Sequence, residues 1–202
     1  MIYAENPFSL ETDRLILRQF TISDLNAFFS IMKDREVNTF LPVLLIGTIE
    51  EAKSYLETNY IEKYKEHDLF HYAVCLKTDN IPIGFINAGS ADGYDLGYGL
   101  SSLHWNKGII TEAGSRVIEQ LKVSGVPYIT ATHDVNNPRS GRVMEKLGMR
   151  YRYSYQEQWQ PKNIRVTFRM YQRNLDGQDG RIYMKYWQMH PVHFIEKISN
   201  AH

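Results

Sequence analysis

The chain has 202 residues, of which 43% are hydrophobic and 23% are charged. This balance is typical of a globular protein and excludes a disordered, charge-rich chain. Lys plus Arg and Asp plus Glu both total 23, so the net charge provides no long-range attraction to nucleic acid or to an anionic membrane. The length gives no reason for a second domain, and we expect one domain over residues 1–202, with a core at about 9–175 and a C-terminal extension at 176–202.

Three features indicate a soluble protein in the reducing cytoplasm. The single cysteine, Cys75, stands in an apolar, strand-like stretch, so we expect a buried and unreactive thiol. Residues 1–10 contain no basic segment followed by a long apolar run. No stretch of the chain approaches the length that spans a bilayer.

The first elements expected along the chain are one short strand and two helices. Residues 15–17 are β-competent and follow a turn-prone segment. Ser23 is a suitable N-cap for a helix whose apolar residues recur at steps of three and four, namely Leu25, Phe28, Phe29 and Met32. Thr48 and Glu51 form a capping box, which predicts a second helix continuing to about Tyr60.

The middle of the chain predicts three consecutive strands, a helix and another strand. The strands cover residues 70–76, 81–87 and 95–100, separated by short turns. Residues 111–122 carry helical apolar spacing and end before Ser124-Gly125, and residues 128–132 are β-branched and apolar.

The last third predicts a short helix and a hairpin. Asn137-Pro138 is an N-cap followed by proline, and Leu147-Gly148 is a typical helix end. Apolar and polar residues then alternate over 151–155 and 164–170, which indicates two paired strands. The whole order of elements favours a mixed α/β sheet covered by helices.

The segment from Asp95 to Ala113 reads as a strand, a short loop and the start of a helix. A helix N-terminus presents backbone N–H groups without partners and a positive dipole end, so it can bind a diphosphate. Gly108 would let the backbone approach such a group, and Lys107 adds a positive charge. Many strand–glycine–helix junctions bind nothing, however, and the segment matches neither the P-loop nor the dinucleotide fingerprint.

Four segments in order resemble one family. Residues 105–113 (Trp-Asn-Lys-Gly-Ile-Ile-Thr-Glu-Ala) resemble the coenzyme A pyrophosphate loop of GNAT acyltransferases, in the branch of the ribosomal-protein N-terminal acetyltransferases. Residues 12–18, residues 95–98 and the pair 136–140 and 145–149 are similar to further segments of that branch. The resemblance covers about residues 9–175.

The resemblance implies a fold, a cosubstrate and a binding site. The fold would be a mixed, mostly antiparallel sheet with helices on both faces, splayed between the strands that carry Gly99 and Ile129. Acetyl-coenzyme A would lie in the splay, and no metal is expected. Its binding residues would be Gly99, Leu100, Ser101, Asn106, Lys107, Gly108, Ile109, Ile110, Thr111 and Asn136. Two residues depart from the family, since Ile110 replaces a usual Gly or Ala and Asn106 replaces a common Gly, Arg or Gln.

The resemblance also implies direct attack of a neutral amine on the thioester. Asp95 is similar in position to a general base, although it could equally end a turn. A backbone N–H near Gly99 or Leu100 would stabilise the oxyanion, unless those glycines only form a bulge. Ser140 matches the donor to the leaving thiolate, with Tyr151 and Tyr153 as other candidates, and a plain role in the first helical turn is the alternative.

Several functional alternatives remain at this point. The acceptor could be a protein N-terminus, a polyamine-like or antibiotic amine, or an amino acid. A noncatalytic acyl-coenzyme A sensor and an RNA-associated protein using the Arg- and Tyr-rich hairpin are rivals, although we expect no nucleic-acid or membrane partner. The pairs His67/His71 and His190/His193 lack the pattern of a metal site. The aromatic tail predicts sheet packing or a homodimer contact.

Overall fold

The computed structural model describes residues 9–65 and 70–197, and its first half forms a five-stranded antiparallel sheet. The strands follow one another in space as in the chain. They are β1 (Ser9–Glu11), β2 (Leu15–Arg18), β3 (His71–Leu76), β4 (Pro82–Ala88) and β5 (Leu96–Leu100). The strands predicted at 15–17, 70–76, 81–87 and 95–100 are confirmed, whereas β1 and the short pairing that it makes with β2 were missed.

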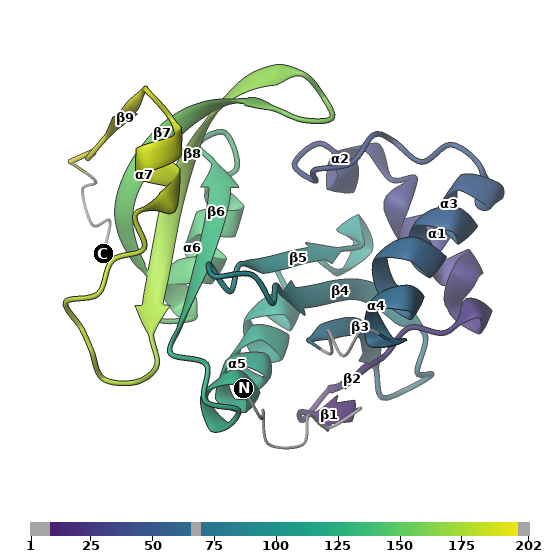
Figure 1. The fold of residues 1–202 in the computed structure, drawn as a ribbon. Helices are drawn as coiled ribbons and strands as arrows, with labels where there is room; N and C mark the ends of the chain where they lie inside the picture. Colours follow the sequence, from purple (N-terminus) through teal and green to yellow (C-terminus); the bar gives the residue numbers. More distant parts are fainter. Residues whose placement is uncertain (1–8, 66–69, 198–202) are drawn as a thin grey trace.

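A second sheet of four strands stands beside the first, in the order β6-β8-β7-β9 (Figure 1). Its strands are β6 (Tyr128–Asp134), β7 (Arg150–Trp159), β8 (Ile164–Asn174) and β9 (His193–Phe194). In the described residues the two sheets join at an isolated parallel bridge between Asp95 and Thr130. The sheet therefore divides between β5 and β6, as predicted, and the mixed, mostly antiparallel fold class is confirmed.

Helices cover both faces of the first sheet. One face packs against α5 (Ile109–Val123) and α6 (Pro138–Lys146) through a core that includes Leu17, Ile86 and Val117. The other face, with Ala73 and Phe85, packs against the N-terminal helices. These are α1 (Leu25–Met32), α2 (Arg35–Asn38), α3 (Ile49–Leu56), a π-helical stretch (Glu57–Ile61) and α4 (Glu62–Lys65). Two short 3₁₀ turns lie at Ile22–Asp24 and Ser102–His104.

The first residues of the observed helices can be compared with the N-caps predicted from the sequence. The Thr48 and Glu51 capping box is confirmed at α3. The expected N-cap Ser23 is wrong, because a 3₁₀ turn precedes α1 and Thr21 caps that turn with Asp24. Asp24 also binds the Arg18 guanidinium at 2.8 Å, which fixes the turn to β2. α5 begins two residues earlier than predicted.

The aromatic tail packs on the second sheet. Rings of Tyr183, Tyr186 and Trp187, the last two in α7 (Lys185–Met189), lie against the cluster of Tyr153, Tyr155, Val166, Phe168 and Met170. β9 then pairs with β7 along its free edge. The predicted sheet packing is confirmed. Cys75 is also buried as expected, and burial raises the pKa of its thiol to about 11. Across the described ranges, the helices are too short or too polar to cross a membrane.

Candidate active site

A cavity of about 830 Å³ lies where the two sheets separate. Most of the predicted site residues line it together, namely Asp95, Gly99, Leu100, Asn106, Gly108, Ile109, Ile110, Thr111, Asn136 and Ser140. Ser101 and Lys107 are exceptions. The Ser101 amide donates to the Ile83 carbonyl at 2.8 Å, and the Lys107 ammonium donates to the Leu103 carbonyl at 2.9 Å. The expected positive charge of Lys107 is therefore directed at its own loop rather than at the cavity.

The start of α5 forms one wall. Gly108 caps the helix with φ of 72°, a left-handed conformation that favours glycine. The first intrahelical bond runs from the Glu112 amide to the Gly108 carbonyl, so the amides of residues 109–111 have no acceptor within the helix. The side chain of Ile110 is only 7% exposed and packs in the core. The larger side chain of Ile110, at a position where the family usually has Gly or Ala, is thus accommodated in the core.

A network from the β1–β2 loop holds this wall in place. Glu112 accepts hydrogen bonds from the Thr12 hydroxyl at 2.6 Å and from the Arg14 amide at 3.0 Å. The Arg14 guanidinium pairs with Glu112 and also donates to the Lys107 carbonyl at 3.1 Å. Burial raises the pKa of Glu112, but the bonds from Thr12 and Arg14 outweigh it and hold the pKa below its usual value. Two sequence segments 98 residues apart therefore fix the loop before α5.

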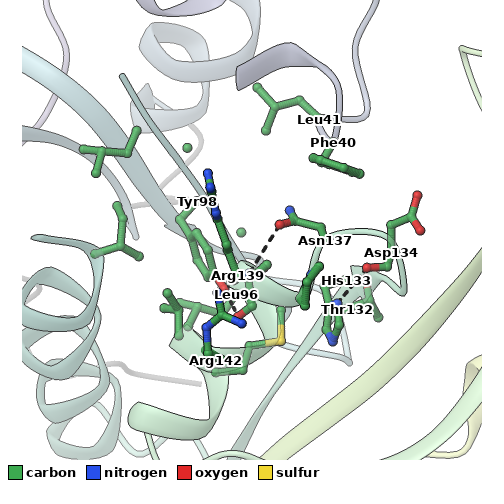
Figure 2. A pocket seen from close by; sticks show the side chains of 18 of the residues that line it. Phe40, Leu41, Leu96, Tyr98, Thr132, His133, Asp134, Asn137, Arg139 and Arg142 are labelled. Carbon is green, nitrogen blue, oxygen red and sulfur yellow. Dashed lines mark hydrogen bonds between the residues drawn. The ribbon is translucent and has the colours of Figure 1, made fainter. Parts of the chain in front are cut away.

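Three cationic side chains from α6 line the same cavity. They are Arg139, Arg142 and Lys146, and Figure 2 labels the two arginines together with Tyr98, which lines the same cavity. Arg139 also lies over the Trp105 ring, 5.5 Å from its centroid. These residues were not predicted as part of the site, although their spacing of three and four places them on one helical face. They supply the charge that was expected from Lys107.

Asp95 sits where the two sheets meet. Thr130 donates its hydroxyl to the Asp95 carboxyl at 3.1 Å, across the bridge between the sheets. The side chain retains partial exposure to the cavity, yet the protein around it desolvates the carboxyl. Burial raises its pKa from 3.8 to about 6, and the Thr130 bond opposes this only in part. A carboxyl with such a pKa is suited to accept a proton near neutral pH.

Ser140, in the first turn of α6, is joined to Tyr98 of β5. Their hydroxyl oxygens lie 2.8 Å apart, and the Tyr98 hydroxyl also donates to the Ser140 carbonyl at 3.1 Å. The other tyrosine candidates point elsewhere, because the Tyr153 hydroxyl donates to the Tyr183 carbonyl and the Tyr151 hydroxyl lies against Ser154. Neither lines the cavity. Tyr98 was missed although it lies in a segment that carried the resemblance.

The backbone of β5 distinguishes Gly99 from Leu100. The amide of Ser101 points to β4, because it donates to the Ile83 carbonyl, and Gly99 pairs with Phe85 of β4. Successive amides of a strand point in opposite directions, so those of Tyr98 and Leu100 face the division between the sheets. A Cβ on Gly99 would stand 2.5 Å from the Phe85 ring. The glycine is therefore needed for core packing, and Leu100 is the better candidate for a donor to an oxyanion.

Asn136 and Asn137 border the cavity at the end of β6. The Asn136 side-chain amide donates to Asp134 at 3.0 Å, and the Asn137 side chain accepts from the Ser140 amide at 3.4 Å as the N-cap of α6 (Figure 2). The predicted cap is confirmed. Both amides are thus held by local bonds at the mouth of the cavity.

Comparison with known proteins assigns the fold to a family. A model described as the acetyltransferase (GNAT) domain matches residues 14–150. The chain belongs to the GNAT acetyltransferase family. A Bacillus subtilis (strain 168) relative, named as the uncharacterized N-acetyltransferase YoaA, is 30% identical over 144 residues, covering 69% of this chain and 81% of that protein.

Solved GNAT structures share the fold at lower identity. The ribosomal-protein-S5-alanine acetyltransferase from Vibrio fischeri superposes with a TM-score of 0.71 at 20% identity, covering 84% of this chain and 97% of that one. RimL, a ribosomal L7/L12 alpha-N-protein acetyltransferase in complex with coenzyme A, gives 0.70 at 15% identity, covering 83% and 97%. At these identities the likeness shows the GNAT fold.

The opposite side of the cavity in this GNAT acetyltransferase is acidic and aromatic. It combines Glu36 and Phe40, from α2 and the residues after it, with Glu157 and further aromatic side chains of the second sheet and the tail. These aromatic residues are Tyr155, Trp159, Phe168 and Tyr186. The Glu157 carboxylate lies 3.3 Å from Nε2 of His190, and burial raises the pKa of Glu157. Cations thus line the α6 side of the cavity and carboxylates line this side.

Two contacts fix α2 above this acidic side. The Lys162 ammonium, at the tip of the β7–β8 hairpin, donates to the carbonyls of Asn38 and Thr39, at 2.5 and 3.0 Å. At the other end of α2, Asp34 caps the helix and accepts from the Ser102 hydroxyl at 2.6 Å. The GNAT cavity is therefore bridged from the hairpin tip to the loop before α5.

Of the two histidine pairs considered in the sequence, His71, His190 and His193 lie in the described residues. His193 contacts the His190 carbonyl through Nδ1, and His67 lies outside the described ranges. No group of three His, Cys, Asp or Glu side chains in the described chain is arranged to hold a metal ion.

Proposed function

We propose that this chain transfers an acetyl group from acetyl-coenzyme A to an amine by direct attack on the thioester. The observation that carries the proposal is one cavity that joins the open amides of α5 to a desolvated carboxyl, Asp95. The first feature suits a diphosphate and the second suits removal of a proton from an ammonium group.

The residues at the α6 side would bind the cosubstrate. The amides of residues 109–111 would accept the diphosphate, and Arg139 and Arg142 would neutralise its charge. Gly108 supports this assignment, because its left-handed backbone has space that a side chain would occupy. Asn136 would hold the pantetheine arm. The coenzyme A complex of the structurally similar RimL supports the same cosubstrate.

Three groups would then carry the reaction. Asp95 would take a proton from the incoming ammonium, which at a pKa of about 10 is mostly charged at neutral pH. The Leu100 amide, which faces the division between the sheets, would stabilise the negative carbonyl oxygen. Ser140, supported by Tyr98, would donate to the departing thiolate.

The acidic side of the cavity would receive the acceptor. Carboxylates of Glu36, Asp95 and Glu157 favour a cation, and the surrounding rings favour an apolar or planar neighbour of the amine. A protein N-terminus and a small amine both satisfy this description. The similarity in fold to two ribosomal-protein acetyltransferases supports including N-terminal Ala and Ser peptides among the candidates.

The test is thiol release from acetyl-coenzyme A over a panel of amines, with calorimetry for coenzyme A binding. The panel contains N-terminal peptides, polyamines, amino acids and aromatic amines. Turnover of one class that is lost in Asp95→Asn supports the proposal. Tight coenzyme A binding without turnover of any amine would instead favour a noncatalytic sensor.

A further inference from the structure

A second, smaller pocket lies at the end of the β7–β8 hairpin opposite its tip. Its volume is about 190 Å³, and we call it the arginine pocket. It is lined by Gly148, Arg150, Arg152, Gln172, Arg173, Asn174 and Asp179. Phe168 borders the active-site cavity and Arg173 borders this pocket, five residues further along β8, which is roughly 17 Å at the rise of a strand. The two sites are therefore separate.

The charges in the arginine pocket are poorly compensated. In residues 9–65 and 70–197, neither Arg150 nor Arg152 forms an ion pair or a side-chain hydrogen bond, and Nε of Arg152 is buried without a partner. Burial and the neighbouring Arg150 charge both lower the pKa of Arg152, with Asp179 opposing them. Three guanidinium groups thus share one lining carboxylate. A buried donor without an acceptor is costly, so an anion that accepts from these guanidinium groups would stabilise the pocket.

The walls of the pocket are held by the surrounding fold. The Arg173 guanidinium donates to the Leu147 carbonyl at 2.8 Å. Gln172 is fully buried, and its side chain binds Asn174 at 2.6 Å and the Arg181 carbonyl at 2.9 Å. The guanidinium of Arg173 also lies close to Gly148, since a Cβ there would stand 3.5 Å from it. These contacts orient the pocket before any ligand binds, which lowers the entropic cost of binding.

We propose that the arginine pocket is a binding site for a small phosphate-bearing anion, distinct from the acetyl-coenzyme A site. Guanidinium groups match the geometry of phosphate oxygens and donate in pairs. The volume suits a single phosphate group with a few waters, since drug-sized ligands occupy about 300 Å³ or more. A small ligand is favoured over RNA, because the site is a confined pocket and the chain has no net positive charge.

The test compares thermal unfolding with inorganic phosphate or with chloride at equal ionic strength, in the presence of coenzyme A. We expect phosphate at ten times its dissociation constant to raise Tm by roughly 3–6 °C in the wild type, beyond its general salt effect. Arg152→Gln and Arg150→Gln should lose this increment. Arg165→Gln is the matched control, because Arg165 is exposed on the same hairpin and its removal changes the net charge equally.

The order of Tm between the wild type and Arg150→Gln should differ between chloride and phosphate, which gives an independent test. In chloride, Arg150→Gln should unfold at a Tm equal to or above that of the wild type, because it relieves the repulsion of Arg152. In phosphate the order should reverse. An equal phosphate response in the wild type and all three variants would overturn the proposal, as would RNA binding that needs Arg152 while phosphate has no effect. Because the comparison is between variants, it stands whether or not coenzyme A binds.

Discussion

The hydroxyl oxygens of Tyr98 and Ser140 lie 2.8 Å apart, so a residue of β5 and a residue of α6 share one proton position across the cavity. Burial raises the pKa of Tyr98, so this phenol stays protonated through the whole working range of pH. The single Tyr98 hydrogen can be donated to the Ser140 carbonyl or to the Ser140 hydroxyl, and in the second arrangement the serine hydrogen is free for a leaving thiolate. A donor that is itself hydrogen-bonded in this way is polarised and donates more strongly.

The first prediction concerns this pair. We expect Ser140→Ala to lower kcat by about 10²-fold, the lower end for loss of a general acid, with little change in KM for acetyl-coenzyme A. Tyr98→Phe should lower kcat by a smaller factor. The double variant should be no slower than Ser140→Ala alone, since Tyr98 acts through the serine. Steady-state kinetics of the four proteins measures this coupling.

Tyr153→Phe is the control for loss of a buried phenol, because its hydroxyl binds the Tyr183 carbonyl away from the cavity. Its kcat should stay close to that of the wild type. Fully additive effects of Tyr98→Phe and Ser140→Ala would contradict the shared proton position.

The second prediction is a pH dependence set by Asp95. A base with a pKa of about 6 is protonated below that pH, so kcat/KM should fall tenfold per pH unit there, after correction for ionisation of the amine. Asp95→Asn should lose this inflection and lower kcat/KM at neutral pH by about 10² or more. Rates measured from pH 5 to 9 check it, and an inflection that persists in the variant would exclude Asp95 as the base.

The same shift predicts a stability change of defined sign. The folded pKa of about 6 exceeds the unfolded value near 3.8, so the folded state binds more protons and loses stability as pH rises between these values. Asp95→Asn removes this cost. The variant should therefore be more stable than the wild type at pH 8, by up to about 3 kcal/mol, and the gain should shrink as pH falls towards 4. Denaturant unfolding at both pH values measures it.

The third prediction tests the start of α5. Gly108→Glu places a charged side chain on a residue with φ of 72° beside the open amides, and should abolish coenzyme A binding by calorimetry. Gly125→Glu is a matched control, because Gly125 follows the other end of α5 with φ of 78° and open space around it. It should share the backbone strain and retain affinity. Equal loss in both variants would assign the effect to strain alone.

Local patterns were sufficient to predict the main elements of this fold. The capping box at Thr48 and the cap at Asn137 appear where expected, because each is made by residues within three positions of one another. Residues 105–113 marked the binding loop for a related reason, since its special geometry belongs to consecutive residues. Asn106 and Gly108 have the left-handed backbone of such a loop, and Arg14 of the distant β1–β2 loop also holds it in place.

The residues that were missed depend on contacts between distant segments. Tyr98 gains its role from Ser140, 42 positions later, and no local pattern reports that distance. Lys107 was expected to face the anion, but its nearest acceptor is the Leu103 carbonyl in the same loop. Gly99 lines the cavity as predicted, but the need for a glycine there comes from Phe85 of the neighbouring strand, which fills the space beside it.

The last prediction concerns Lys162, which bridges the hairpin tip to α2 over the acceptor side of the cavity. Lys162→Met keeps an aliphatic stem near Trp159 but removes both bonds to the carbonyls of Asn38 and Thr39. Without them α2 loses its contact with the hairpin tip, and the wall that carries Glu36 becomes less ordered. We expect KM for the amine to rise roughly threefold to tenfold, equivalent to about 1 kcal/mol, with the affinity for coenzyme A unchanged. Arg165→Met on the same hairpin is the control, and an equal rise in KM there, or a parallel loss of coenzyme A affinity, would show that the bridge does not shape the acceptor side.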